Sequence, residues 1–480
     1  MSSESGRILA ANSQVIASLQ EGDLLGYDQE GRLYVQKSGE ESQKTQRVFE
    51  EAQAKTLKQE KGQAIVLATQ KHFETLDSKE FLGTYRKVLQ VINQDQVLST
   101  VDKKNLVDAL YQSHYKHLCN EGIDPVTAEA TITIMMSFDP EVDPETKERI
   151  SPSRATGGMS GAYYIRNREG EKIGVFKPRD EEPYMPNNPN RCKRRDTGAI
   201  RTEMRNGQAS GTACYKEVIA YEVLGDFAPI PPTTFIEVYF PRSIREKDME
   251  LILKFGSFQR FVEGYTLDTI RNLDVESIPV LDLQKMASSD IVGYNADRSM
   301  GNMMYDSEKN QLHCIDQGVT FLSSLDWNLP PDDILAEVSC HWGDFPQCRG
   351  PILPEVKDWI LGLDENKIES IIRSRMQMVL TQENAPSTGD LEKYINGIVV
   401  SNKTLILFIK KAAEKGCTLS QIGEMVMEIE SENETDPKVP MIQKICREAS
   451  AAREANNPNF LADPWKFVSD TMDKYLEDIH

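Results

Sequence analysis

Two stretches in the second half of the chain indicate the fold class, namely SDIVGYNADRSMGN (residues 289–302) and LHCIDQG (residues 312–318). The first continues an apolar helical pattern into a polar loop, in which Asp297 and Asn302 stand five positions apart. The second is a short apolar strand pattern that ends at Asp316, in an Asp-x-Gly sequence. Carboxylate and amide oxygens bind Mg²⁺, and a carboxylate can accept a proton from a hydroxyl, so both loops predict chemistry.

A glycine-rich loop and a charged pair precede these stretches. Residues 156–162, TGGMSGA, stand before a strand pattern, where backbone N–H groups can approach phosphate oxygens. Lys177 ends the strand pattern KIGVFK, and Glu217 lies on the helix-like run CYKEVIAYEVL. Each feature alone fits an ordinary turn or a solvated edge residue. In the order glycine loop, Lys, Glu, Asp-x₄-Asn and Asp-x-Gly they favour a kinase.

In these motifs the chain resembles the phosphatidylinositol 3-/4-kinase superfamily, and most closely the type II phosphatidylinositol 4-kinases. The resemblance covers about residues 150–375. The segments that carry it are GMSGAY (158–163), VFKPRDEEPY (175–184), GSFQRFVEGY (256–265), DRSMGN (297–302), DQG (316–318) and WGDFPQCRGPILPEVKDWILGLD (342–364). The resemblance implies an α+β, bilobed, protein-kinase-like fold, with a strand-rich N-lobe and a helical C-lobe.

The resemblance also implies a set of site residues and two cofactors, ATP and Mg²⁺, with Mn²⁺ as an alternative metal. The catalytic residues would be Asp297, Arg298 and Lys177, and the metal ligands would be Asn302 and Asp316. The nucleotide would contact Gly158, Ser160, Gly161, Lys177 and Glu217, with the connector Gln259, Arg260, Phe261 and Val262 against adenine. Asp297 would orient or deprotonate the acceptor hydroxyl, while positioning and charge neutralisation would lower most of the barrier.

Changes in the pattern of apolar and polar residues along the chain predict five regions. Residues 1–40 contain a small hairpin, and 41–150 form a helical regulatory or partner-binding region for an unidentified protein, ending in a linker at 138–153. The N-lobe would occupy 151–262 and the C-lobe 263–430, before a helical tail at 431–480. The two regions that flank the lobes match no family that the motifs suggest.

Composition narrows the class of protein. The 480 residues include 55 Lys and Arg against 75 Asp and Glu, a net charge of −20, which argues against a general nucleic-acid binder. The eight cysteines form no CxxC pair, so no zinc knuckle is predicted. No apolar run reaches membrane-spanning length, and the start MSSESGR does not resemble a secretory signal. We therefore expect a cytoplasmic protein, with peripheral membrane contact as an option.

One departure from the family concerns membrane contact. Between 191 and 205 the chain has six basic residues against two acidic ones and the single Cys192, where the family carries a cysteine-rich insertion. The residues proposed for an anionic surface are Arg191, Lys193, Arg194 and Arg195. Such a cluster attracts anionic lipid or an inositol phosphate. A solvated loop that balances an acidic protein is the alternative.

A second departure concerns the acceptor. From Asn310 to Cys348 there is no Lys or Arg, while six Asp or Glu residues occur. Such a segment suits a neutral or basic acceptor, such as a protein, although phosphatidylinositol itself carries only one phosphodiester charge. Gln317 also replaces the Asn of the family's Asp-Asn-Gly, and Met159 and Ala162 replace small polar loop residues. These changes leave the implied metal ligands in place.

We expect phosphatidylinositol as the acceptor. The alternatives are a protein Ser/Thr kinase on the same scaffold, a nucleotide-binding interaction module whose catalysis has faded, and an enzyme that transfers a group other than phosphate. Intact Lys177, Asp297, Asn302 and Asp316 argue against the faded module. Full activity of an Asp297→Ala variant would favour transfer of another group, since that chemistry has no need of this carboxylate.

Overall fold

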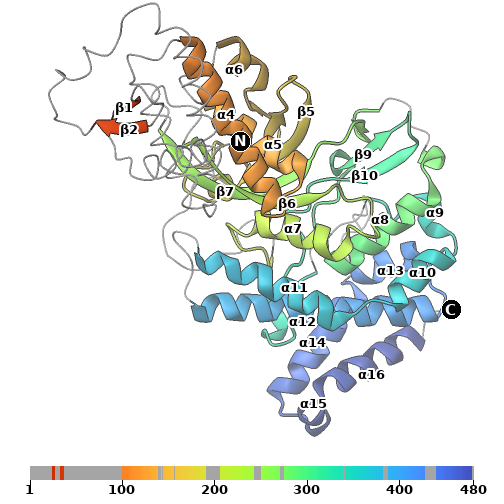
Figure 1. Ribbon diagram of the computed structural model, residues 1–480. Helices are drawn as coiled ribbons and strands as arrows, with labels where there is room; N and C mark the ends of the chain where they lie inside the picture. Colours follow the sequence, from red (N-terminus) through yellow and green to blue (C-terminus); the bar gives the residue numbers. More distant parts are fainter. Residues whose placement is uncertain are drawn as a thin grey trace, which may run out of the picture. The chain divides into compact units, whose positions relative to one another are not determined.

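A computed structural model describes residues 24–27, 33–36, 100–138, 142, 144–155, 157–190, 206–242, 250–270, 275–336, 338, 341–381, 388–427 and 439–477. Within these ranges, antiparallel strands combine with many helices, which confirms the predicted α+β class (Figure 1). The chain divides into two compact units. The first comprises Met1–Ser153, 165–173 and 238–240, and the second comprises Arg154–Tyr164, Gly174–Glu237 and Pro241–His480.

The first unit is mainly helical in its described part. Its elements are β1 (Leu24–Tyr27), β2 (Leu33–Gln36), α4 (Thr100–Asn120), α5 (Pro125–Phe138) and α6 (Pro144–Ile150). β1 and β2 pair as the predicted antiparallel hairpin. α5 begins after Asp124, whose Oδ1 accepts hydrogen bonds from the N–H groups of Val126 and Thr127 at 3.1 and 3.2 Å. The aromatic and apolar residues between 81 and 92 recur at helical spacing, which favours a packed core face, but they lie outside the described residues.

Two expectations about this unit have different outcomes. For the pair Met135 and Met136, packed core is the expectation rather than a cofactor site, and both are buried in α5 at 8% and 5% exposure. The segment 138–153, predicted to be a linker, contains the helix α6 instead. Pro144 opens that helix, because a proline at the first helical position costs no backbone hydrogen bond. That proline marks a helix start, and the linker prediction is wrong there.

A five-stranded sheet, in the order β3-β4-β5-β7-β6, carries Lys177 and the glycine-rich loop of the candidate site. The strands are β3 (Ser153–Arg154), β4 (Tyr163–Arg166), β5 (Lys172–Pro178), β6 (Thr233–Pro241) and β7 (Leu251–Arg260). β5 and β7 are antiparallel, with Lys177 opposite Ser257 and Val175 opposite Gln259. Side chains alternate along a strand, so Phe176 is fully buried on one face while Lys177 stands on the other. Helix α7 (Ala213–Leu224) packs against β7.

The rest of the second unit is mainly helical. Its helices are α8 (Val280–Gly293), α9 (Pro346–Arg349), α10 (Pro354–Leu361), α11 (Glu365–Gln377), α12 (Thr388–Glu414), α13 (Leu419–Val426), α14 (Met441–Glu454), α15 (Pro458–Ala462) and α16 (Pro464–Glu477). A small sheet joins β8 (Tyr265–Thr266), which precedes α8 in the sequence, to β9 (Met303–Asp306) and β10 (Gln311–Cys314), which follow it. Short 3₁₀ turns occur at η2 (Arg179–Glu181), η3 (Val275–Ser277), η4 (Met300–Asn302), η5 (Pro331–Asp333) and η6 (Met378–Thr381).

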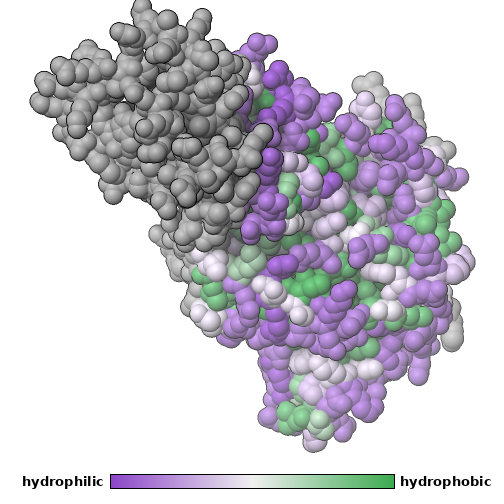
Figure 2. All heavy atoms as spheres, viewed as in Figure 1, coloured by the Kyte–Doolittle hydropathy of each residue, from purple (hydrophilic) through white to green (hydrophobic). Residues whose placement is uncertain are grey.

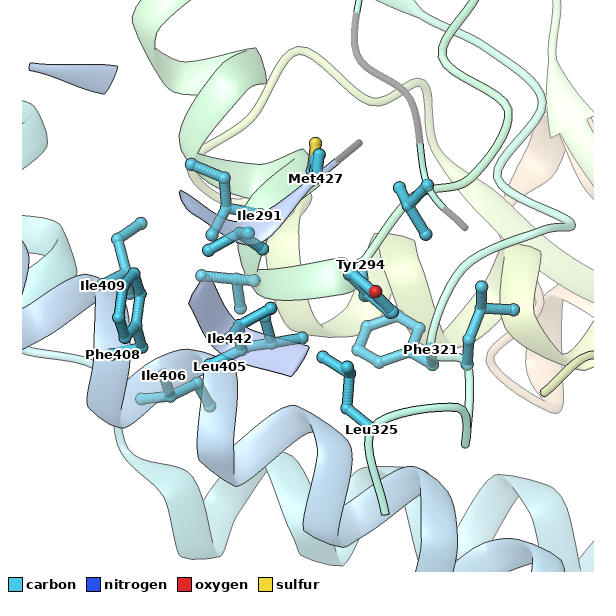
Figure 3. Packing of buried hydrophobic residues seen from close by; sticks show 14 of the residues in the cluster. Ile291, Tyr294, Phe321, Leu325, Leu405, Ile406, Phe408, Ile409, Met427 and Ile442 are labelled. Carbon is cyan, nitrogen blue, oxygen red and sulfur yellow. The ribbon is translucent and has the colours of Figure 1, made fainter. Parts of the chain in front are cut away.

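The main apolar core of the second unit gathers around α8 and α12. Figure 3 shows Ile291 of α8, Leu405 and Ile409 of α12 and Ile442 of α14 in one cluster with Leu325. Each of these side chains is fully buried. Burial of such side chains is worth about 1.5–3 kcal/mol each. The last helices are therefore part of this core.

Polar side chains cover most of the described surface in the view of Figure 2, with apolar patches between them. Tyr265 and Met159 are among the exposed large apolar residues, at 71% and 44% exposure. Within the described ranges, no helix combines the length and the apolar character that a membrane crossing requires.

Candidate active site

Three charged side chains that lie far apart in the sequence meet on the face of β5 opposite to Phe176. Lys177 donates a hydrogen bond to Glu217 of α7 and another to Oδ1 of Asp316 at 2.9 Å. The Glu217 side chain is 1% exposed, and its second oxygen accepts the N–H of Gln317 at 3.1 Å. The strand lysine, the helix glutamate and the Asp-x-Gly aspartate thus form one ionic cluster.

Each of the three groups shifts the pKa values of the other two. Burial alone would lower the pKa of Lys177, but the carboxylates of Asp316 and Glu217 raise it above its ordinary value. The charge of Lys177 holds the pKa of Asp316 below its usual range. Burial raises the pKa of Glu217, against the opposing effect of Lys177. Lys177 is therefore a fixed cation and Asp316 a fixed anion at neutral pH.

Asp316 also has an unusual backbone conformation. Its φ is 58°, in the left-handed region that Asp and Asn tolerate better than most residues. Its side chain is 47% exposed although it bonds Lys177. A strained and accessible carboxylate is typical of a residue held in place for binding.

The loop after α8 is joined to the Asp316 strand through the backbone. The N–H of Ile315 donates to the carbonyl of Asn302 at 3.1 Å. The side-chain amide of Asn302 donates to the carbonyl of Asp297 at 2.6 Å, which leaves its Oδ1 as the acceptor. The N–H of Asp297 donates to Oδ1 of Asn295 at 2.9 Å. Both predicted metal ligands therefore stand on neighbouring, mutually bonded segments.

Arg298 holds these two segments together from inside the protein. Its side chain is 1% exposed and pairs with Asp290 at 3.0 Å. Its Nη1 donates to the carbonyls of Asn302 and Ile315 at 2.7 and 2.8 Å. A guanidinium engaged in this way cannot reach a bound substrate. The sequence-based assignment of Arg298 as a catalytic residue is therefore replaced by a positioning role.

The predicted glycine-rich loop connects β3 to β4, with the Ala155 N–H bonded to the Ala162 carbonyl at 2.8 Å. Gly158 has a φ of 74° and open space above its Cα. Ser160 is partly exposed in the same loop. The N–H of Gly161 instead donates to the Glu181 carbonyl at 3.0 Å, and a Cβ there would meet the Glu181 carboxylate at 2.0 Å. Gly161 thus serves close packing, and its amide is engaged within the protein.

The predicted adenine connector is partly strand. Gln259 and Arg260 lie in β7, where Gln259 donates its side-chain amide to Thr233 at 3.1 Å. The N–H of Arg260 donates to the Pro232 carbonyl at 2.8 Å. Phe261 and Val262 follow the strand and are partly exposed. Only the last two of the four predicted residues stand outside the strand, because the sheet ladder extends further than the sequence pattern suggests.

Several residues that support the cluster had no predicted role. Glu182 accepts the N–H groups of Ala213 and Cys214 at 3.0 and 2.9 Å, at the first turn of the helix that carries Glu217. Glu181 accepts hydrogen bonds from Lys254 and Tyr163. The signal was present in VFKPRDEEPY, where two acidic residues follow an apolar strand, but their partners are remote in the sequence.

Two asparagines fix the glycine-rich loop. Asn188 donates to the carbonyl of Met159 at 2.8 Å and to that of Glu181 at 2.9 Å. Asn190 donates to the carbonyl of Gly158 at 3.0 Å. Isolated asparagines in a loop give no sequence signal for such contacts.

The donor set agrees with magnesium bound together with phosphates. Among the described residues, no three His, Cys, Asp or Glu side chains gather at metal-binding geometry. Mg²⁺ typically takes one or two protein oxygens and completes its shell with phosphate and water. The Asp316 carboxylate and the Oδ1 of Asn302, whose amide nitrogen bonds Asp297, match that pattern, whereas a zinc site would need more protein ligands.

The basic residues Arg191, Lys193, Arg194 and Arg195 lie outside the described residues. The membrane contact predicted for them stays a prediction.

Comparison with known proteins matches no family model. The chain is 27% identical over 315 residues to phosphatidylinositol 4-kinase gamma 7 of Arabidopsis thaliana, covering 63% of this chain and 44% of that protein. It is 28% identical over 320 residues to phosphatidylinositol 4-kinase gamma 6 of the same plant, with 63% and 47% covered. The match to phosphatidylinositol 4-kinase gamma 2 is 24% identical over 449 residues and covers 85% and 74%. The chain spans about half the length of the first two relatives.

Proposed function

We propose that this chain, which is related to the phosphatidylinositol 4-kinases, transfers the γ-phosphoryl group of ATP to a hydroxyl, most simply that of phosphatidylinositol. The relatives are named phosphatidylinositol 4-kinase gamma. The resemblance to the type II enzymes is therefore more specific than these names, and it is part of the proposal. The proposal includes the bilobed kinase-like fold and the lobe boundaries at 151–262 and 263–430. It also includes Mg²⁺, with Mn²⁺ as the alternative metal, and a cytoplasmic location.

The observation that carries the proposal is the ionic cluster of Lys177, Glu217 and Asp316. In the proposed reaction Lys177 would neutralise phosphate oxygens of ATP, and Asp316 would hold the metal ion. Bound Mg²⁺ would supply charge neutralisation for the transferring group. Asp297 would orient the acceptor hydroxyl and take its proton.

The glycine-rich loop would cover the phosphates. Gly158 presents an open surface there, while Asn188 and Asn190 restrain the loop carbonyls. The adenine would lie against Phe261 and Val262 where the chain leaves β7. Phe261 packs edge-on against Tyr164 of β4, with 6.0 Å between ring centroids. That contact would join one wall of the nucleotide site to the strand after the loop.

Transfer of label from γ-labelled ATP tests the proposal, with phosphatidylinositol vesicles and a mixed lysate offered in parallel. Asp316→Asn serves as the inactive variant, because Asn tolerates the same left-handed φ and so preserves the backbone. Asp358→Asn, which changes the same charge at an exposed position of α10, serves as the matched control. We expect label in the lipid with the wild type and with Asp358→Asn, and none with Asp316→Asn.

Other outcomes separate the alternatives. Label on protein bands alone would indicate a protein kinase, which the acidic composition of 310–348 favours. Binding of ATP without any transfer would indicate an interaction module. Label in the lipid that persists in Asp316→Asn would contradict the assigned site.

We further propose that the segment 191–205 contacts an anionic surface, and that the region 41–150, which the sequence predicts to be helical, binds a protein partner. Neutralising Arg191, Lys193, Arg194 and Arg195 together should weaken binding to vesicles of anionic lipid and leave ATP binding unchanged. Equal vesicle binding by the neutralised variant would exclude this surface.

A further inference from the structure

The segment after the Asp-x-Gly motif is held from the side by the C-terminal helix α14. This segment, residues 325–336, contains the 3₁₀ turn η5 and is otherwise without regular structure. Some of its backbone groups bond within the segment, such as the N–H of Leu329 to the Asp326 carbonyl at 2.9 Å, and the others need partners outside it. α14 packs against η5 and supplies many of these partners.

Four polar residues of α14 make the contacts, and their spacing places them on one helical face. They are Gln443, Arg447, Ser450 and Arg453.

The bonds run from this face to the main chain of the segment. Gln443 accepts the N–H of Ala336 at 3.0 Å, and Arg447 donates to the carbonyl of Ile334 at 3.2 Å. Ser450 donates to the carbonyl of Leu329 at 2.5 Å. Arg453 donates to the carbonyl of Asn328. These bonds constrain the path of the segment, while the side chains of Asp332 and Asp333 stay exposed.

Further contacts fix the first residues of the segment. Trp327 is 6% exposed and packs edge-on against Phe460 of α15 and Trp465 of α16, with centroid distances of 5.5 and 5.4 Å. At the start, the N–H of Leu325 donates to the Ser401 hydroxyl of α12 at 3.1 Å. Leu325 also shares the apolar cluster of Figure 3 with residues of α12 and α14.

The exposed side chains of the segment are acidic. Asp332 and Asp333 are exposed on η5, only sixteen and seventeen positions after Asp316. The tail brings Arg447 and Arg453 beside this stretch, which has no cation of its own between Asn310 and Cys348. The charge around the segment is therefore less negative in three dimensions than along the sequence.

We propose that α14 is a built-in positioning element, which holds residues 325–336 in one conformation as the acceptor-binding side of the site. This inference rests on the proposed phosphoryl transfer, because the segment can only position an acceptor if there is one. The nucleotide contacts, in contrast, come from other elements. Loosening the segment should therefore affect the acceptor and not ATP.

The test uses the full chain with Gln443→Leu combined with Arg447→Leu, which removes two bonds to the segment without changing the apolar face of α14. Lys444→Gln, an exposed position on the same helix, is the matched control. Ser450→Ala is a milder variant in case the double variant fails to fold. Two readouts are needed, namely hydrogen exchange of peptides that span 325–336, and the KM values for ATP and for phosphatidylinositol in phosphatidylcholine vesicles.

We expect exchange of the segment to rise about tenfold for each hydrogen bond lost, with exchange in β7 unchanged. The KM for phosphatidylinositol should rise by about the same factor, with the KM for ATP unchanged. Lys444→Gln should match the wild type in both readouts.

The positioning role would be overturned if hydrogen exchange of the segment or the KM for the acceptor stayed unchanged. It would also be overturned if the double variant transferred phosphate faster than the wild type, which would indicate an autoinhibitory contact. A wild type that transfers no phosphoryl group would overturn the proposed function together with the acceptor side of this inference. The exchange readout would then still show whether α14 holds the segment, so the two failures are distinguishable.

Discussion

At the scale of single residues, buried charges organise the candidate site. Arg298 and Asp290 form a pair in which both side chains are at most 2% exposed. Trp342 and Asn295 also donate to Asp290, at 3.1 Å each. A buried charge without its partner is strongly unfavourable, so this network has one stable arrangement.

The first prediction concerns this pair. Arg298→Met should lower the free energy of unfolding by about 3–5 kcal/mol, because Asp290 would stay buried without its cation. Adding Asp290→Asn should restore part of that stability. Activity should stay low in both variants, since the carbonyls of Asn302 and Ile315 lose their donor in each. Denaturant titration and kcat measure the two effects, and a double variant no more stable than the single one would contradict this account.

A second prediction at this scale concerns pH. Lys216 is fully buried, donates to Gln208 and lies 5.7 Å from the centroid of the Tyr394 ring. Burial lowers the pKa of Lys216 from 10.5 to about 7. The unfolded chain therefore binds more protons than the folded one between these values, so this residue makes stability rise with pH across that window.

Lys216→Met should remove this contribution. The stability of the variant relative to the wild type should be greater at about pH 7 than at about pH 9.5, by on the order of 3 kcal/mol. Chemical denaturation of both proteins at the two pH values measures the difference. A pH-independent difference would show that Lys216 keeps its ordinary pKa in the folded protein.

At the scale of elements, the strand that carries Lys177 also controls the helix that carries Glu217. The motif that follows β5 places Glu182 against the first turn of α7, where helix N–H groups lack internal partners. Arg179 of the same motif donates to the Gly211 carbonyl at 2.9 Å, just before that helix. Strand and helix are thus joined twice before Lys177 meets Glu217.

We predict that Glu182→Gln lowers stability by about 1 kcal/mol, the usual contribution of a helix cap, because an amide oxygen accepts more weakly than a carboxylate. The affinity for ATP should fall as well, since Glu217 lies in the next turn of α7. Glu424→Gln on α13 changes the same charge at an exposed position and should alter neither quantity. If Glu182→Gln bound ATP as tightly as the wild type, the helix cap would have no influence on the nucleotide site.

At the scale of the whole molecule, the tail belongs to the core of the second unit. Ile442 and Ile445 of α14 and Val468 and Met472 of α16 are fully buried. α16 packs against α12, and α14 against α13. Removing these helices would therefore expose a large apolar surface.

A protease site introduced between Met427 and Val439 tests this. After cleavage, the tail fragment should co-elute with the rest of the chain and unfold with it in a single transition, because the apolar contacts survive the cut. Size-exclusion chromatography and thermal unfolding provide the readouts. A tail fragment that separates without denaturant would show that its packing contributes little.

The sequence by itself determined the order of the motifs and the mixture of strand and helix. Spacing within one loop or strand is local, so the positions of Lys177, Glu217, Asp297, Asn302 and Asp316 follow from a few residues each. The hairpin at β1 and β2 and the buried methionines of α5 are also local signals, and both are confirmed.

Only the tertiary structure decided which of these groups meet and which are otherwise engaged. Arg298 is buried, Gly161 packs on Glu181, and Gln259 belongs to a strand, because each depends on partners that are distant in the sequence. The same holds for the hydrogen bonds by which Glu182 caps α7 and by which α14 holds residues 325–336, since their partners are also distant in the sequence. A hydrogen bond to a backbone atom does not depend on the side chain of the residue that carries this atom. Such bonds therefore leave no pattern in the sequence of the segment that they hold.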